Sequence, residues 1–238
     1  MESPIIIALD FSNREQVDHF LNRFDTNGLF VKVGMELFYQ QGPAIISDLK
    51  DRGCNIFLDL KLHDIPNTVK KAMKGLAGLG VDIVNVHAGG GRTMMEFALE
   101  GLDQGTPSSE KRPECIAVTQ LTSTSQETMR NDLLIQGTME KVVVSYAKLA
   151  QSAGLDGVVC SPLETQVIKL TCGSRFLTVT PGIRLAKNTA DDQSRFTTPR
   201  EARKFGSDYI VVGRSITQAK DPVQAYEQIQ AEWSEAHE

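Results

Sequence analysis

Residues 55–87 read NIFLDLKLHDIPNTVKKAMKGLAGLGVDIVNVH, which has the pattern of a strand, a helix and a second strand. The runs at 55–61 and 81–87 are short and mostly apolar, as expected when both faces of a parallel sheet are covered. Between them, residues 66–79 repeat their apolar positions with helical period, and Gly80 stands where that helix would end. The stretch therefore predicts one β-α-β unit.

The same alternation continues on both sides of this unit. Six further apolar runs of strand length lie at 4–10, 29–35, 115–121, 155–160, 175–180 and 208–214. Other stretches of helical period lie at 13–24, 43–52, 93–102, 138–153 and 221–233, and Gly53 and Gly154 follow two of them. Eight alternations favour a single-domain (β/α)8 TIM barrel spanning residues 1–238. A doubly wound open sheet is the structural alternative.

Composition excludes several classes of function. The chain has 238 residues, a net charge of −5 and a pI of about 5.5, which gives no basic surface for nucleic acid. No apolar run approaches the roughly 20 residues of a membrane span, and the N-terminus lacks the apolar segment of a signal peptide. The four cysteines have no metal-binding spacing and are expected to be reduced thiols. We therefore expect a cytoplasmic protein.

Two connections are longer and more polar than the others. They lie at 121–136 and 182–195, each after a predicted strand. The carboxyl ends of the strands form the catalytic face of such barrels, so both segments are candidate lids. The three glycines at 89–91 are expected to form a flexible turn into a helix near Thr93.

Four charged residues interrupt the ends of otherwise apolar strands. Asp10 ends the first strand, Lys32 lies in the second, and Asp59 and Lys61 close the third. Alternate residues of a strand point to one side, so Asp59 and Lys61 should project together. A buried ion costs several kcal/mol unless it is paired, so a cluster of this kind points to function. Asp64, which follows, is either part of this cluster or the N-cap of the next helix.

A second group of residues has the composition of a phosphate site. Residues 181–184 (PGIR) follow the seventh predicted strand, and residues 213–215 (GRS) join the eighth strand to the last helix. The loops after these two strands commonly hold phosphate in TIM barrels. Glycine lets backbone N–H groups approach the ligand, and arginine offers a planar fork of donors.

Residues 59–68, DLKLHDIPNT, resemble the signature of the orotidine 5′-phosphate decarboxylase family, D-x-K-x-x-D followed by I-P-N-T. The resemblance continues along the chain, in IIIALD (5–10), VKVG (31–34), LTS (121–123), TPGIR (180–184) and VVGRS (211–215). It is closest to the bacterial branch. It implies a TIM barrel that converts orotidine monophosphate to uridine monophosphate and CO2 in pyrimidine biosynthesis. It also implies a carbon–carbon lyase without metal or other cofactor, working as a homodimer.

The resemblance also assigns roles to residues. The implied catalytic residues are Lys61, Asp59, Asp64 and Lys32, with Lys61 protonating C6 of the pyrimidine. The implied substrate contacts are Asp10, Lys32, Asp59, Thr68, Thr122, Ser125, Arg184, Gln193, Gly213 and Arg214. Asp64 and Thr68 would act in the site of the neighbouring subunit. Arg184, Gly213 and Arg214 would hold the phosphate.

These residue types suit the chemistry. Loss of CO2 leaves an electron pair in the plane of the ring, where the π system delocalises it poorly. A lysine ammonium close to C6 stabilises that charge more strongly as it develops, which is transition-state stabilisation. Repulsion between Asp59 and the substrate carboxylate would in addition raise the ground state.

Three other functions are alternatives to the decarboxylation that the resemblance implies. The nearest is a Mg²⁺-dependent sugar-phosphate decarboxylase or aldolase, such as the 3-keto-gulonate phosphate decarboxylases, which share D-x-K-x-x-D. Those enzymes carry a carboxylate on strand two as a metal ligand, where this chain has Lys32. The second is a silent barrel that only binds a nucleotide. The third is a Schiff-base enzyme, which needs an uncharged lysine amine that flanking carboxylates disfavour.

Overall fold

The computed structural model describes residues 4–185 and 197–235. Its eight parallel strands form a closed barrel in which each strand pairs with the next and β8 pairs with β1. The strands are β1 (Ile5–Ala8), β2 (Phe30–Gly34), β3 (Asn55–Leu62), β4 (Ile83–His87), β5 (Glu114–Val118), β6 (Gly157–Val159), β7 (Leu177–Thr180) and β8 (Tyr209–Val212). The closed order confirms the predicted TIM barrel and excludes the open sheet.

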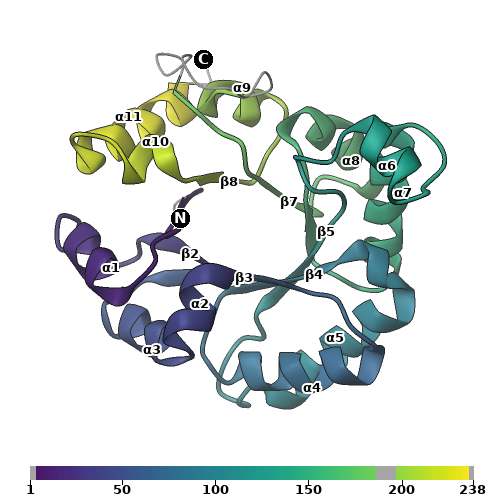
Figure 1. Cartoon of the computed structure of the whole chain (residues 1–238), viewed down its shortest axis with the longest axis horizontal. Helices are drawn as coiled ribbons and strands as arrows, with labels where there is room; N and C mark the ends of the chain where they lie inside the picture. Colours follow the sequence, from purple (N-terminus) through teal and green to yellow (C-terminus); the bar gives the residue numbers. More distant parts are fainter. Residues whose placement is uncertain (1–3, 186–196, 236–238) are drawn as a thin grey trace.

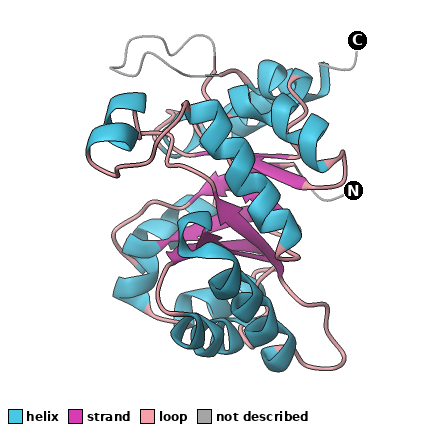
Figure 2. Cartoon of the chain, turned by 90° about the vertical axis from the view of Figure 1, so that its right-hand side faces the viewer, coloured by secondary structure: helices cyan, strands magenta, loops and turns pink. Residues whose placement is uncertain are grey.

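Helices surround the strands on the outside of the barrel (Figure 1). The α-helices are α1 (Arg14–Leu21), α2 (Met35–Gln41), α3 (Ala44–Asp51), α4 (Pro66–Ala77), α5 (Gly91–Gly105), α6 (Gln126–Asn131), α7 (Met139–Ser152), α8 (Thr165–Cys172), α9 (Pro199–Lys204), α10 (Arg214–Thr217) and α11 (Pro222–Ser234). Two short 3-10 turns, η1 (Ala88–Gly90) and η2 (Pro162–Glu164), precede α5 and α8. In the side view of Figure 2 the strands lie in the middle of the molecule with helices around them.

The strands divide their buried side chains between two apolar layers. In β1, Ile6 and Ala8 belong to the cluster that fills the barrel, while Ile5 and Ile7 belong to the larger cluster beneath the helices. The barrel cluster consists of Ile6, Ala8, Phe30, Phe57, Ile83, Ile116, Val179 and Val211. This period of two explains why each strand reads as a continuous apolar run in the sequence.

The predicted helices are confirmed, and the structure contains several short helices that were not predicted. These are α2, α6, α8, α9 and α10, which have between four and eight residues each. The connection at 121–136, expected to be a polar loop, therefore contains α6. Gly53 and Gly154 have φ of 80° and 91°, as expected for glycines just beyond helix C-termini.

The prediction for the three glycines at 89–91 is wrong in detail. Residues Ala88–Gly90 form η1, and α5 begins at Gly91 rather than near Thr93. A Cβ on Gly90 would lie 2.2 Å from the Sδ atom of Met94. The turn is therefore packed against the first turn of α5, and a side chain at Gly90 would displace the flexible end of Met94.

The four cysteines are free, as predicted, and all four are buried. Burial raises the pKa of the Cys54 thiol to about 11 and that of Cys115 to about 12, so both are unreactive thiols at neutral pH. Within residues 4–185 and 197–235, no helix combines the length and the hydrophobicity needed to cross a bilayer.

Candidate active site at the carboxyl ends of the strands

Four side chains of alternating charge form a row across the carboxyl ends of β1, β2 and β3. The Nζ atom of Lys32 lies 3.1 Å from Asp10 Oδ1 and 3.3 Å from Asp59 Oδ2. The other oxygen of Asp59, Oδ1, lies 2.7 Å from the Nζ atom of Lys61. The structure therefore brings together the four strand-end charges singled out in the sequence. We call Asp10, Lys32, Asp59 and Lys61 the charged row.

The interior of the charged row is shielded from solvent and its two ends are more open. The side chains of Lys32 and Asp59 are 10% and 11% exposed, whereas Lys61 is 24% and Asp10 63% exposed. Burying these ions is tolerable because each has an opposite charge beside it. The open ends leave Asp10 and Lys61 available to a ligand above the barrel.

Gly34, the last residue of β2, leaves the space that Lys32 needs. A Cβ at this position would lie 3.2 Å from Lys32 Nζ and 3.6 Å from Asp10 Oδ1. The backbone of Gly34 has φ of −92°, so the requirement here is for space and not for a left-handed conformation.

The backbone of β3 departs from regular strand geometry at Lys61. Its φ is +53°, a left-handed value that costs an L-residue about 1–2 kcal/mol. The register with β4 shifts between Leu58 and Leu62, so the regular alternation predicted for this strand does not hold there. Asp59 and Lys61 nevertheless meet as predicted, and Leu60 between them packs in the outer apolar layer.

Asn85, a residue of β4, lies against this irregular part of β3 and was not among the predicted site residues. Its side chain is 1% exposed, donates from Nδ2 to Asp59 Oδ1 at 2.7 Å, and accepts the Lys61 backbone N–H at 2.7 Å. A polar amide within the apolar run IVNVH was the sequence signal that could have found it.

One of the two interpretations of Asp64, that it is the N-cap of α4, is wrong. The N-cap position is Ile65, and Asp64 Oδ1 accepts the Ile65 backbone N–H at 2.6 Å. Asp64 is exposed and forms no ion pair with any of the described residues. Thr68, in the first turn of α4, is exposed as well. Neither residue lies in a closed site within one chain.

The residues predicted in the two candidate lid segments lie in different surroundings. Thr122 is exposed in the turn after β5. Ser125 is the N-cap of α6, and its Oγ accepts the Thr128 backbone N–H at 3.0 Å. Gln193 lies outside the described residues.

The predicted phosphate residues follow β7 and β8, which are neighbours in the barrel. Gly182 has φ of +81°, and the next residues are held in place by a bridge in which Arg184 N–H donates to Thr197 O at 3.1 Å. Gly213 is the N-cap of α10, and Arg214 is its exposed first residue. A Cβ at Gly213 would lie 3.8 Å from Asp10 Oδ2, which places this turn beside the charged row.

Two histidines that were not among the predicted site residues lie next to the charged row. The rings of His63 and His87 have centroids 5.7 Å apart. The pKa of His87 is lowered from its usual value, first by burial and then by the charges of His63 and Lys61, while Asp59 opposes the shift. A neutral imidazole at the end of β4 adds no further positive charge beside Lys61.

A model of the orotidine 5′-phosphate decarboxylase / HUMPS family matches residues 3–229. The chain belongs to this family. An orotidine 5′-phosphate decarboxylase from Geobacillus sp. is 61% identical over 98% of each chain, and one from Bacillus caldolyticus is 60% identical over 98% of this chain and 96% of its own. The crystal structure of orotidine 5′-phosphate decarboxylase from Lactobacillus acidophilus is 47% identical, with a TM-score of 0.88 over 97% of this chain and 98% of its own. An uncharacterized conserved protein from Geobacillus kaustophilus is 56% identical, with a TM-score of 0.87 over 97% of this chain and 100% of its own.

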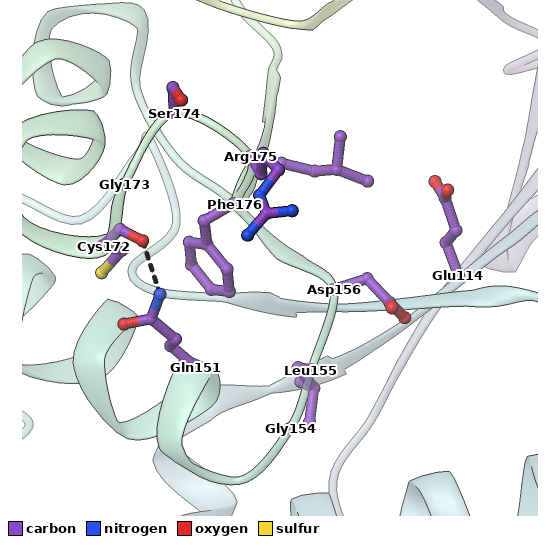
Figure 3. A pocket seen from close by; sticks show the side chains of 11 residues that line it. Glu114, Gln151, Gly154, Leu155, Asp156, Cys172, Gly173, Ser174, Arg175 and Phe176 are labelled. Carbon is purple, nitrogen blue, oxygen red and sulfur yellow. Dashed lines mark hydrogen bonds between the residues drawn. The ribbon is translucent and has the colours of Figure 1, made fainter.

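A separate pocket of about 660 Å³ lies at the opposite end of the barrel from the residues that carry the family signature. Figure 3 shows the side chains that line this pocket. It is lined by residues that precede or begin β5, β6 and β7, including Glu114, Asp156 and Arg175. The carboxylate of Asp156 is already bound, because Arg112 donates to both its oxygens at 3.0 Å and the Cys115 N–H donates at 2.7 Å. In TIM barrels this end serves stability, and the arrangement agrees with that role.

Proposed function

We propose that this chain decarboxylates orotidine 5′-phosphate to uridine 5′-phosphate at the charged row, without a metal ion. The observation that carries the proposal is the Lys61 ammonium, held 2.7 Å from Asp59 at the rim of a barrel that belongs to this family. The named relatives at about 60% identity support the same substrate.

The reaction breaks the bond between C6 and the carboxylate carbon, and CO2 leaves. The electron pair of that bond stays on C6, and the Lys61 ammonium donates a proton to it. The amine then regains a proton from solvent. At about 4 Å and an effective dielectric near 20, the attraction between the ammonium and the developing charge is worth about 4 kcal/mol. Because it grows as charge moves to C6, it lowers the barrier rather than only tightening binding.

Asp59 has two tasks in this proposal. It holds Lys61 through Oδ1 and Lys32 through Oδ2, so both ammonium groups have fixed positions before substrate arrives. It also lies beside the substrate carboxylate, whose charge it repels until CO2 departs. Lys32 and the open carboxylate of Asp10 are then the groups that meet the ribose hydroxyls.

The phosphate would bind where the turns after β7 and β8 come together. Arg184 and Arg214 supply donor forks, and Gly213 lets the backbone approach the oxygens. Thr122, Ser125 and Gln193 belong to the segments proposed to close over the pyrimidine. Phosphate binding is remote from C6, so its energy can drive that closure, and substrates without phosphate should lose rate as well as affinity.

The site would be completed by a second copy of the chain. Asp64 is exposed and has no ionic partner among the described residues, and it is followed by Ile65, which is 68% exposed. Other large apolar residues exposed near the carboxyl ends of the strands are Met35, Tyr39 and Leu121. We propose a homodimer in which Asp64 and Thr68 reach the neighbouring charged row. The free, buried thiols suit the reducing cytoplasm, where we expect the protein to act.

A magnesium-dependent sugar-phosphate reaction is the second candidate, because the family description includes the HUMPS branch. Lys32 Nζ occupies the gap between Asp10 and Asp59, at 3.1 and 3.3 Å from their oxygens. A divalent cation bound there would be repelled by this ammonium. The charged row therefore favours the metal-free reaction.

The two candidates are separated by one assay. The purified protein is mixed with orotidine 5′-phosphate in EDTA, and the loss of substrate absorbance is followed. The proposal expects turnover in EDTA that added Mg²⁺ does not increase. No turnover of orotidine 5′-phosphate, together with Mg²⁺-dependent turnover of a 3-keto sugar phosphate, would replace this function by the second candidate.

A further inference from the structure

The pairing of β3 with β4 contains a local excess of residues on β3. Leu58 pairs with Val84, and Leu62 pairs with Val86. Asp59, Leu60 and Lys61 therefore lie opposite the single residue Asn85. Regular ladder hydrogen bonds cannot form across such a bulge, so its backbone groups need other partners.

Asn85 supplies those partners with both ends of its side-chain amide. Its Oδ1 accepts the Lys61 backbone N–H at 2.7 Å, and its Nδ2 donates to Asp59 Oδ1 at 2.7 Å. A backbone N–H can only donate and an ionised carboxylate can only accept, so the two neighbours fix which end of the amide is which. Asn85 is 1% exposed, so it makes no contact with bulk solvent.

Lys61 is consequently held at two points. Asn85 binds its backbone N–H, and Asp59 binds its Nζ at 2.7 Å. Asp59 Oδ1 accepts from both the Lys61 ammonium and the Asn85 amide. Together with the bond from Lys61 N–H to Asn85, these contacts form a closed ring of three residues, in which Lys61 is the left-handed one. Without Asn85, Lys61 could relax toward ordinary strand geometry, and its ammonium would move away from its present direction.

We propose that Asn85 is a positioning residue for the decarboxylation, acting through Lys61 and Asp59 and touching no substrate. It keeps Lys61 in the left-handed conformation that directs Nζ over the mouth of the barrel. The inference rests on the proposed function, because the value of this geometry lies in delivering a proton to C6.

The test uses two substitutions at this position. Asn85→Ala removes both hydrogen bonds. Asn85→Asp keeps an acceptor for the Lys61 N–H, loses the donor to Asp59, and adds a carboxylate beside it. Thr178→Val is the control, because Thr178 is fully buried in β7 and donates to Asp208 far from the charged row. Wild type and all variants are assayed with orotidine 5′-phosphate, and binding of uridine 5′-phosphate and thermal unfolding are measured in parallel.

For Asn85→Ala we expect kcat to fall about 100-fold, which is typical of a misplaced catalytic group, while KM and binding of uridine 5′-phosphate change less than about threefold. For Asn85→Asp we expect a similar loss at neutral pH and a partial recovery of kcat, relative to wild type, as pH falls. A protonated carboxyl at this position can both accept from Lys61 N–H and donate to Asp59, as the amide does. The titratable groups that face it are Asp59 and Lys61 on β3, Lys32 on β2, and His87 and His63 beside them, and all are common to wild type.

A residue that serves only the fold would lower the unfolding temperature as Thr178→Val does and leave kcat of the folded protein unchanged. That outcome, a change in KM alone, or failure of both Asn85 variants to fold would overturn the proposal. Wild-type protein that is itself inactive on orotidine 5′-phosphate would overturn the proposed function, and this inference with it.

Discussion

At the scale of single residues, the site depends on side chains whose neighbours leave them little freedom. Lys32 lies between two carboxylates, and the missing side chain of Gly34 provides the room for its ammonium. A small change at Gly34 should therefore affect the reaction without touching a charged group.

Gly34→Ala places a methyl group 3.2 Å from Lys32 Nζ, closer than ordinary van der Waals contact. We expect the ammonium to shift by a few tenths of an ångström and kcat/KM to fall about tenfold, because catalytic groups tolerate little displacement. Steady-state kinetics with orotidine 5′-phosphate would measure this. An unchanged kcat/KM would mean that the position of Lys32 is not critical.

His87 should make the stability of the protein depend on pH. Its pKa in the folded protein is lowered below the usual 6.5, mainly by burial, so the unfolded chain binds the proton more readily. Stability is therefore lost as pH falls below 6.5 toward the lowered pKa, and above 6.5 the residue has no effect. His87→Gln should reduce the loss in free energy of unfolding between about pH 7.5 and about pH 5.5. His19→Gln, which changes an exposed imidazole on α1, is the control and should leave the loss as in wild type; equal behaviour of the two variants would contradict the assignment.

The charged row could be predicted from the sequence, and its supporting residues could not. Asp10, Lys32, Asp59 and Lys61 stand out because they interrupt apolar strands. Asn85 interrupts a strand too, but its importance comes from the register shift opposite Lys61, which depends on how two strands pair and not on either strand alone. The interpretation of Asp64 as an N-cap was wrong because the N-cap position of α4 is one residue later, at Ile65, and the helix begins at Pro66.

At the scale of elements, all eight strands and six of the helices follow from periodicity, including α1 and α3 with eight residues each. The helices α2, α6, α9 and α10 have four to seven residues, too few turns to show an apolar stripe, and α8 with eight residues was missed as well. Capping signals were nevertheless present. Thr198 and Glu201 form a capping box around Pro199 at the start of α9, and Ser161 and Glu164 form another at η2, just before α8.

Helices α4 and α5 lie side by side on the outside of the barrel (Figure 1) and touch backbone to backbone. A Cβ on Gly101 of α5 would lie 2.2 Å from the carbonyl oxygen of Lys70 on α4. Gly101→Ala should therefore lower the free energy of unfolding by about 1–3 kcal/mol, because the two backbones must separate.

Gly75→Ala is the matched control, since this glycine lies in α4 and an added Cβ would meet nothing within 4 Å. It should raise the stability by about 0.5–1 kcal/mol, the usual advantage of alanine over glycine in a helix. Denaturant titrations of both variants check the pair, and equal effects of the two substitutions would show that the helices are not in backbone contact.

At the scale of the whole molecule, the closed barrel places residues from distant parts of the chain on one rim. Asp10 and Gly213 are about two hundred residues apart and adjoin because β8 pairs with β1. Within one chain Asp64 is exposed and has no ionic partner among the described residues, and this is why we propose a site shared between two subunits.

Mixed dimers test that sharing. Lys61→Ala and Asp64→Asn should each be inactive alone. If Asp64 acts across a two-fold interface, unfolding and refolding an equal mixture should restore about a quarter of wild-type activity, because half the dimers are hybrids with one intact site of two. If both residues serve one chain, the mixture stays inactive.

The role of Lys61 can be measured in single turnovers of orotidine 5′-phosphate in EDTA, with wild type, Lys61→Ala and Lys71→Ala side by side. Lys71 is an exposed lysine of α4 and controls for loss of one positive charge. We expect wild type and Lys71→Ala to decarboxylate at equal rates and Lys61→Ala to be slower by at least about a thousandfold, the equivalent of about 4 kcal/mol. A Lys61→Ala rate within about tenfold of wild type would show that another group supplies the charge and the proton at C6.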